Sequence, residues 1–328
     1  MATTAHPAVT AGSEAEAGRR RGSGLHALLA RAISIDPRET ELAVRGFAPC
    51  AVDVRAALEE HGRSFVHGFN SSIRARGEAE LEASLEAVAE AERGFAFEGA
   101  AMGLALLDLV LPARRRRLAA FVGGPAAPHV YMAHVGAGWA LARLHRRPSR
   151  RLGLDPLLRW LAFDGYGFHE AFFHPQRAVR EGRRPRRLRG YELGVFDQGL
   201  GRALWFVETA DPERIAATVG SLAPERRADV WSGVGLAATY AGAVDESGLR
   251  RLVELARPFR SDLAQGAAFA AKARLRAGNP VPHVERACAV LCERDAEGAA
   301  AATDRALVPA AGSYERWRAE IRAAFGAA

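Results

Sequence analysis

One pattern limits the fold of this chain more than any other. An aromatic residue, a polar residue and glycine precede a run of small residues at two places about 130 residues apart, 97–104 and 231–238. Two more pairs of segments match in the same order, namely 67–69 with 198–200 and 135–140 with 265–270. Because the three matches are collinear, the sequence predicts an internal duplication.

Helical patterns dominate the rest of the sequence. Apolar residues recur near a 3.6-residue period, and Asp155-Pro156 and Asp211-Pro212 each place a capping residue before a proline suited to the first helical turn. Strand patterns are scarce. We therefore predict an all-α, mostly helical fold whose duplication gives two pseudo-twofold related halves. The predicted helices cover 56–63, 78–93, 99–111, 135–144, 156–163, 212–222, 224–241, 247–256, 263–277 and 281–294.

The predicted organisation follows from this duplication. The first residues are rich in Ala, Gly, Thr and Glu and are expected to be disordered. The parts in chain order are a disordered tail (1–24), a first helical repeat (25–150), a connector with an arginine-rich run (151–194), a second helical repeat (195–310) and a C-terminal helix or tail (311–328).

The basic residues carry little information about partners. Of 328 residues, 45 are basic and 38 acidic, and every basic residue except Lys272 is arginine. This bias indicates a GC-rich coding sequence rather than phosphate recognition, which uses lysine freely. Arginine clusters at 114–117, 146–151 and 177–189 are either solvated connectors or a surface that docks an acidic partner. No aromatic residues interleave them, so no nucleic-acid partner is predicted.

The three cysteines, Cys50, Cys288 and Cys292, are too few for a disulfide framework and indicate a reducing, cytoplasmic location. Cys288 and Cys292 are either buried apolar side chains or a metal or redox pair. Neither cysteine nor histidine spacing predicts a metal site. The longest weakly polar stretch, 99–113, is too short for a transmembrane helix, so no membrane span is predicted.

The Gly- and Ala-rich helices admit two interpretations. Small side chains let helix backbones approach closely. Alternatively, they leave a slot for a slender apolar ligand, since pockets form readily between helices. In the second interpretation Gly103, Gly138, Gly235 and Ala268 line the slot.

The stretch 164–175 is the densest in chemically versatile side chains. His169 and His174 are five residues apart, so they lie about 140° apart around a helix and do not fit the zinc-protease motif. His169 with Asp164 or Glu170 forms either an acid/base pair or a structural polar network.

Glu98 completes the catalytic candidates His169, Asp164 and Glu170. It directly precedes an almost wholly apolar run, where a carboxyl group is either paired or raised in pKa. The equivalent residue in the second half is Ser232, and a helix-capping role for either one is open. The candidate ligand-binding residues are His134, Trp139, Tyr166, Asp197, Gln198, Trp205, Trp231, Gln265 and Lys272, of which Lys272 is either a buried amine or reaches solvent.

The motifs of several enzyme classes are missing. Gly136-x-Gly138 lacks a preceding strand and a third glycine, and the sequence contains no Gly-Lys-Ser/Thr phosphate loop and no Gly-x-Ser-x-Gly nucleophile elbow. We therefore predict no cofactor.

Six longer strings stand out along the chain. They are GFAFEGAAM (94–102), PHVYMAHVGAGWA (128–140), DGYGFHE (164–170), FDQGLGRALW (196–205), DVWSGVGL (229–236) and LAQGAAFAAKAR (263–274). Together they resemble the bacterial domain-of-unknown-function family 1702, which is found in enediyne polyketide clusters. Their length and order make the resemblance more specific than any single motif, and it covers about residues 30–308.

The resemblance implies a role in enediyne biosynthesis, beside the iterative polyketide synthase and thioesterase, in turning a linear conjugated polyene into the enediyne core. It brings no established catalytic residues. The implied partners are an apolar polyene and the polyketide synthase or other pathway proteins. Two classes of function stay open. The chain is either an enzyme that acts on the polyene or a non-catalytic protein that binds and shields it and docks through its arginine runs.

Overall fold

The computed structural model describes residues 31–111, 116–147 and 152–326. Within these ranges the regular structure is helical and no residue forms a β-strand, which confirms the all-α prediction. The predicted tail over 1–24 lies outside the described residues.

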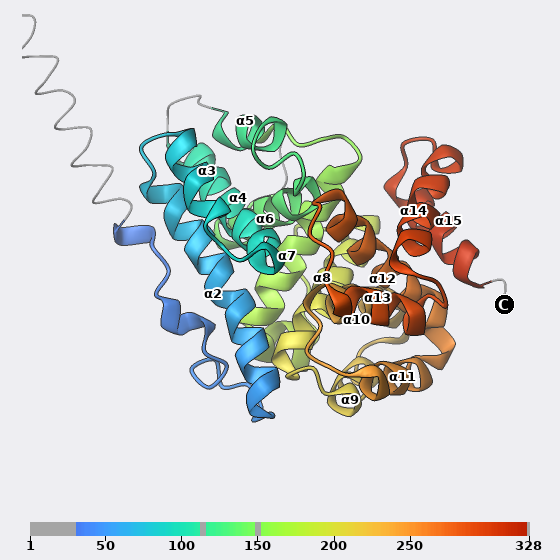
Figure 1. The fold of residues 1–328 in the computed structure, drawn as a ribbon. Helices are drawn as coiled ribbons and strands as arrows, with labels where there is room; N and C mark the ends of the chain where they lie inside the picture. The colour runs from blue at the N-terminus through green and yellow to red at the C-terminus, as the bar shows by residue number, and fades with distance from the viewer. Residues whose placement is uncertain (1–30, 112–115, 148–151, 327–328) are drawn as a thin grey trace, which may run out of the picture.

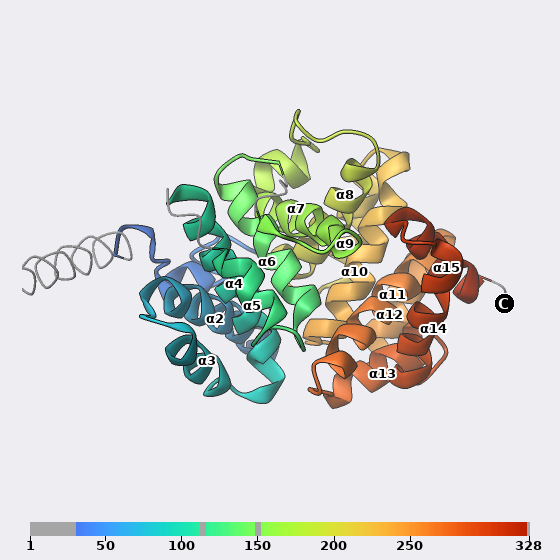
Figure 2. The same ribbon diagram turned by 90° about the horizontal axis from the view of Figure 1, so that it is seen from above.

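Seven helices stand side by side in one row, and their spatial order follows their order in the chain (Figure 1). Figure 2 shows the same row from above, with α2 near one end and α12 near the other. The row consists of α2 (Val52–Arg74), α4 (Arg93–Val110), α6 (Val130–Arg143), α7 (Leu161–Phe173), α8 (Tyr191–Val207), α10 (Arg227–Ala241) and α12 (Arg260–Arg276).

Glycine sets the spacing between these helices. A Cβ atom on Gly199 of α8 would lie 1.8 Å from the carbonyl oxygen of Asp164, and one on Gly167 of α7 would lie 1.9 Å from that of Phe196. No side chain fits at such distances. Only glycine lets the two backbones touch, and its Cα–H groups then face the carbonyl oxygens of the neighbouring helix.

The same reciprocal contact recurs along the row. A Cβ on Gly201 would meet the carbonyl of Val230, and one on Gly233 would meet that of Gln198. Residue numbers therefore rise along one helix as they fall along its neighbour, so adjacent helices run antiparallel. We call the glycines whose added Cβ would lie at most 2.1 Å from a backbone carbonyl oxygen of the preceding helix the contact glycines. They are Gly99, Gly136, Gly165, Gly199, Gly233 and Gly266.

The glycines proposed to line a slot are also packing positions. A Cβ on Gly138 would lie 2.1 Å from the carbonyl oxygen of Ala162, and one on Gly235 would lie 2.0 Å from that of Leu263. Gly103 faces Ser72 of α2 in the same way, with 2.0 Å between the added Cβ and the hydroxyl oxygen. The close-packing interpretation is correct for these glycines, and the slot interpretation is wrong.

The 130-residue offset has a counterpart in this row. Gly99 of α4 and Gly233 of α10 occupy equivalent contacts four helices apart, and the matched segments 97–104 and 231–238 contain them. The superposition of two complete halves stays a prediction.

Shorter helices cover the sides and one end of the row. Helices α14 and α15 pack on α12 and close that end (Figure 1). The remaining α-helices are α3 (Glu78–Glu86), α5 (Arg117–Gly123), α9 (Pro212–Ser221), α11 (Glu246–Leu255), α13 (Pro282–Leu291), α14 (Ala296–Ala310) and α15 (Tyr314–Gly326). The short helical turns are η1 (Pro37–Thr40), η2 (Glu90–Glu92), η4 (Leu158–Trp160), η5 (Gln176–Arg180), η6 (Pro224–Arg226) and η7 (Arg257–Phe259).

The largest difference from the predicted organisation is in the segment 151–194. It was expected to connect two halves, yet it contains α7, a central helix of the row. Residues 161–171 of α7 are all buried. A helix that is buried on every side shows no apolar stripe, so the 3.6-residue pattern is absent there.

The arginine run 177–189 is partly internal. Three of its side chains pair with carboxylates that are almost fully buried, although Arg177 and Arg180 themselves remain about half exposed. The pairs are Arg177 with Glu170, Arg180 with Glu208 and Arg184 with Asp197.

The glycine contacts can be tested by adding one methyl group. Gly235→Ala is expected to destabilise the protein by about 1–3 kcal/mol, because its Cβ would overlap the Leu263 carbonyl and push α10 from α12. Gly220→Ala in α9 is the control. Its Cβ would meet nothing within 4 Å, and it is expected to stabilise by about 0.5–1 kcal/mol. Urea unfolding measures both values, and similar values for the two variants would contradict the packing argument.

Candidate functional site

A polar side chain directly precedes the contact glycine in most helices of the row. In α6 this position holds the apolar Val135. Since the glycines hold the helices close together, the polar side chains on neighbouring helices reach one another. The polar residues at this position, all buried, are Glu98, Asp164, Gln198, Ser232 and Gln265.

These side chains form a polar line across the core. The Gln198 amide donates to Asp164 Oδ2 at 2.6 Å, and the Ser232 hydroxyl donates to Gln265 Oε1 at 2.9 Å. Ser232 Oγ lies 3.3 Å from Gln198 Oε1 and so connects the two pairs. At the end of the line, Arg318 Nε donates to Gln265 Oε1 at 3.1 Å. Most polar groups on the line therefore have partners within the protein, as buried polar groups require.

Arg202 joins this line to Glu98. Its guanidinium donates to Asp164 Oδ1 at 2.5 Å and lies 3.7 Å from Glu98 Oε1. Burial lowers the pKa of Arg202, but the two carboxylates outweigh burial, so the net shift is upward and the side chain stays charged. One cation thus faces two carboxyl groups and is bound closely to only one of them.

Of the two carboxyl groups, Glu98 lies farther from the positive charge of Arg202. Burial raises its pKa to about 7, against the opposing effects of Arg202 and of a 3.0 Å hydrogen bond from Trp139 Nε1, and the charge of Asp164 raises it further. The side chain is 2% exposed. Glu98 is therefore close to half protonated at neutral pH, and it can either donate or accept a proton.

Glu98 and Arg202 border a cavity of about 60 Å³, which we call the aromatic cavity. Its wall is almost entirely apolar and includes phenylalanines from four helices of the row. The lining residues are Ile35, Glu39, Thr40, Leu42, Leu58, His61, Gly62, Phe65, Val66, Phe95, Glu98, Trp139, Phe168, Phe172, Phe173, Arg202 and Phe206.

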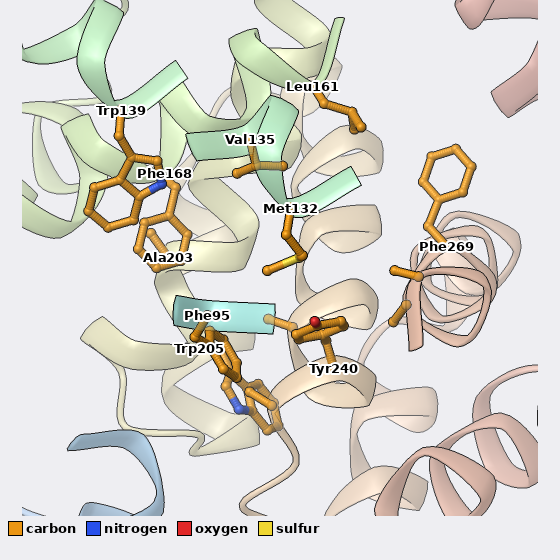
Figure 3. Packing of buried hydrophobic residues seen from close by; sticks show 14 of the residues in the cluster. Phe95, Met132, Val135, Trp139, Leu161, Phe168, Ala203, Trp205, Tyr240 and Phe269 are labelled. Carbon is orange, nitrogen blue, oxygen red and sulfur yellow. The ribbon is translucent and has the colours of Figure 1, made fainter. Parts of the chain in front are cut away.

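Trp139 links the aromatic wall to the carboxyl group. Its ring centroid lies 4.3 Å from that of Phe65 and 4.9 Å from that of Phe168, and Figure 3 shows Trp139 and Phe168 side by side. The indole N–H donates to Glu98. Trp139 therefore holds the carboxyl group and forms part of the apolar surface beside it.

The segment before α2 forms another wall of the aromatic cavity. The Asn70 side chain fixes it at Ile35, accepting from the Ile35 N–H at 3.0 Å and donating to the Ile35 carbonyl at 2.9 Å. Arg45 donates to the carbonyls of Phe172 and Phe173 at the end of α7. The wall is thus tied to both α2 and α7.

His169 does not form the predicted acid/base pair with Asp164, whose oxygens bind Gln198 and Arg202. His169 Nδ1 lies 3.6 Å from Glu170 Oε1, too far for a hydrogen bond, and neither atom has another partner. Burial lowers the pKa of His169, so the imidazole is neutral near pH 7. Burial raises the pKa of Glu170, but its ion pair with Arg177 opposes burial, and the net shift of the pKa is downward.

Several predicted ligand-binding residues support the fold instead. Trp205 Nε1 donates to the Gly242 carbonyl at 3.0 Å. His134 contacts the Val130 carbonyl through Nδ1 and accepts from the Asp155 N–H through Nε2, so both ring nitrogens are used. The other buried residues of this kind are Asp197, which binds Arg184 and Arg226, and Tyr166 and Trp231, which lie in the core.

Lys272 is not a buried amine. Its Nζ lies 2.7 Å from Asp304, and its side chain is 22% exposed. The interpretation in which its stem reaches toward solvent is correct.

The sequence analysis missed Arg202 and Tyr240. Arg202 lies within the quoted string 196–205, where an arginine surrounded by apolar residues was a usable signal. Tyr240 ends an apolar helix, and nothing in its neighbours distinguishes it from a core aromatic residue.

The described residues contain neither a metal-binding cluster nor a membrane-spanning helix. No group of three or more His, Cys, Asp or Glu side chains there is placed to hold a metal ion. Among the helices formed by those residues, none is long and apolar enough to cross a membrane.

The fold and the site define an all-helical protein with an ionisable group at the border of an apolar cavity. The chain belongs to the family described as Protein of unknown function (DUF1702), whose model matches residues 25–325. This match confirms the family resemblance. No curated protein and no solved structure matches the chain.

The raised pKa of Glu98 predicts a specific pH dependence of stability. The folded state binds an extra proton between the unfolded pKa of 4.5 and the folded value of about 7, so the contribution of Glu98 to stability falls as pH rises through that window. Glu98→Gln cannot ionise. Relative to the parent, its free energy of unfolding is expected to rise by roughly 3 kcal/mol between pH 4 and pH 8.

The difference in the free energy of unfolding between Glu98→Gln and the parent reports the titration of Glu98 alone. His129 and His283, with pKa values lowered to about 4, titrate over an overlapping range with the opposite sign, but they do so in both proteins. Glu246→Gln, at an exposed ion pair with Arg250, is the control and is expected to show little change over this range. Urea unfolding at several pH values gives the result. A pH-independent difference for Glu98→Gln would show that its carboxyl group has an ordinary pKa.

Proposed function

We propose that this protein binds a slender, apolar, unsaturated molecule in the aromatic cavity and that Glu98 transfers a proton to or from it. The observation that carries the proposal is a carboxyl group with a pKa of about 7 at the border of a cavity walled by aromatic rings. Perturbed groups of this kind concentrate at functional sites.

The shape of the cavity limits the ligand. Its volume of about 60 Å³ is smaller than the roughly 150 Å³ that holds a benzene ring, so it excludes a ring system and takes only one segment of a narrow chain. Aromatic walls favour a ligand with π electrons, because rings attract one another beyond the gain from burial. A linear conjugated chain has both properties.

The charges around Glu98 suit proton transfer. Arg202 stays cationic, and it supports negative charge that develops beside it. Trp139 fixes Glu98 Oε1 through the indole hydrogen bond. Asp164, the second carboxylate on Arg202, holds the guanidinium in place, so we assign it a positioning role.

The family resemblance extends this proposal to a pathway. It implies that the ligand is the linear conjugated polyene of enediyne biosynthesis and that the chain acts during core maturation, in the cytoplasm, beside the polyketide synthase. The alternative is a non-catalytic protein that binds and shields the polyene. The ion pairs of Arg177, Arg180 and Arg184 reduce the charge that 177–189 offers to an acidic partner, whereas Arg186 and Arg187 of this run are exposed and remain available for docking. We also propose that the repeated glycine contact descends from duplication of a helical unit.

Binding is tested with methyl trans-parinarate, a neutral linear tetraene whose fluorescence increases in apolar surroundings. The parent is expected to bind it, and Leu58→Phe, which fills the aromatic cavity, is expected to weaken binding at least tenfold. Leu85→Phe enlarges a buried leucine outside this cavity and serves as the control for overpacking. Equal affinities for the two variants, both shown to be folded by thermal unfolding, would rule out this cavity.

Catalysis is tested by following the absorption of the linear polyene with the pure protein and then with the neighbouring pathway proteins. If the protein is an enzyme, the polyene bands disappear, and Glu98→Gln slows this loss about 100-fold or more while binding is retained. His169→Gln, which changes a neutral imidazole outside the polar line, is expected to keep most of the activity. A spectral shift that reverses on extraction, with no turnover, favours the shielding function.

A further inference from the structure

A second cavity borders Arg202 but not Glu98. It has a volume of about 40 Å³ and is bordered by α6, α7, α8, α10, α12 and α15. Figure 3 shows Met132 and Val135 of α6 on one side of this region, with Tyr240 and Phe269 across from them. Its wall is almost as apolar as that of the aromatic cavity.

Arg202 is the one residue that borders both cavities among the described lining residues. Its two carboxylate partners divide between them, because Glu98 borders the aromatic cavity and Asp164 borders the second cavity. A single guanidinium and its partners therefore stand between two apolar spaces.

Tyr240 supplies an unused hydrogen-bond donor at the second cavity. Its side chain is 3% exposed, it borders the cavity, and its hydroxyl has no partner. This hydroxyl packs against Gly94 of α4, where an added Cβ would lie 1.8 Å from it. A buried hydroxyl without a partner is costly, and a bound polar atom removes that cost.

We propose that the second cavity is a subsite for the end of the same slender ligand and that Tyr240 donates a hydrogen bond to a neutral oxygen, a carbonyl or hydroxyl, carried by that end. The proposal rests on the proposed function. An anionic group fits poorly, because the charge of Arg202 is already shared by Glu98 and Asp164. The cation at the rim, Lys272, is likewise paired with Asp304.

The contacts of Arg202 indicate how one chain would reach both cavities. The guanidinium is held at 2.5 Å by Asp164 but lies 3.7 Å from Glu98. The weaker contact is the one that opens with less cost. A chain that passes on this side runs beside the Glu98 carboxyl group, so binding in both cavities would place its middle next to the proton donor.

The test uses neutral 1-alkanols of 6 to 16 carbons that compete with methyl trans-parinarate. In the parent, affinity is expected to rise roughly threefold to fourfold per added methylene until the chain fills both cavities, and then to level off. Ala270→Leu fills the second cavity, so its affinities should level off at a shorter chain, with short alkanols unaffected. Ala273→Leu, nearer the rim, gives the same measurement if Ala270→Leu does not fold.

The hydroxyl contact has its own matched pair of variants. Tyr240→Phe is expected to weaken the binding of long alkanols roughly threefold to tenfold and to leave the binding of alkanes of equal length unchanged. Tyr314→Phe, at another buried tyrosine that borders neither cavity, is expected to leave the affinities for both alkanols and alkanes unchanged. If no ligand binds any form of the protein, the proposed function fails. A different result overturns only the second subsite. In that result parinarate and short alkanols bind, but the alanine variants leave the dependence on chain length unchanged, and Tyr240→Phe leaves the preference for alkanols over alkanes unchanged.

Discussion

The close contact between glycine and a backbone carbonyl is the constraint on which the rest of this structure depends. At Gly165, Gly199 and Gly233 the helices approach until no Cβ fits between them. The residue before each of these glycines is also buried between the helices. When that residue is polar, it must find a partner on a neighbouring helix, and Asp164, Gln198 and Ser232 do so. The packing rule and the polar line are thus two results of one sequence pattern.

At the candidate site one positive charge, that of Arg202, faces the two carboxyl groups of Glu98 and Asp164. Arg202 compensates Asp164 at close range and Glu98 at 3.7 Å, and among the described residues no other cation forms an ion pair with Glu98. A buried carboxyl group with partial compensation takes up a proton instead of remaining charged. The aromatic rings around the cavity keep the surroundings apolar and so maintain the raised pKa.

The sequence predicted the part of the site that depends on local patterns. Glu98 was identified because a carboxyl group before an apolar run has few ways to be hydrated, and Trp139 was among the candidate ligand-binding residues. Arg202 was missed, since its partners lie 38 residues away in α7 and 104 residues away in α4, and no local pattern encodes such contacts. His169 was paired with Asp164 although five residues separate them, a spacing that turns two side chains to different faces of a helix. The fold class followed from periodicity, whereas most of α7 and all of α8 were missed because nearly every face of each helix is buried.

The central claim is that Glu98 is partly protonated near neutral pH. The most direct measurement is the titration of this carboxyl group by ¹³C NMR of protein labelled at the glutamate side-chain carboxyl. The Glu98→Gln variant identifies the resonance of Glu98. The account predicts a midpoint at about pH 7, well above those of the exposed glutamates. A midpoint near the ordinary value of 4.5 would contradict it, because a carboxylate that is fully ionised at neutral pH would be a structural partner of Arg202 and no proton donor.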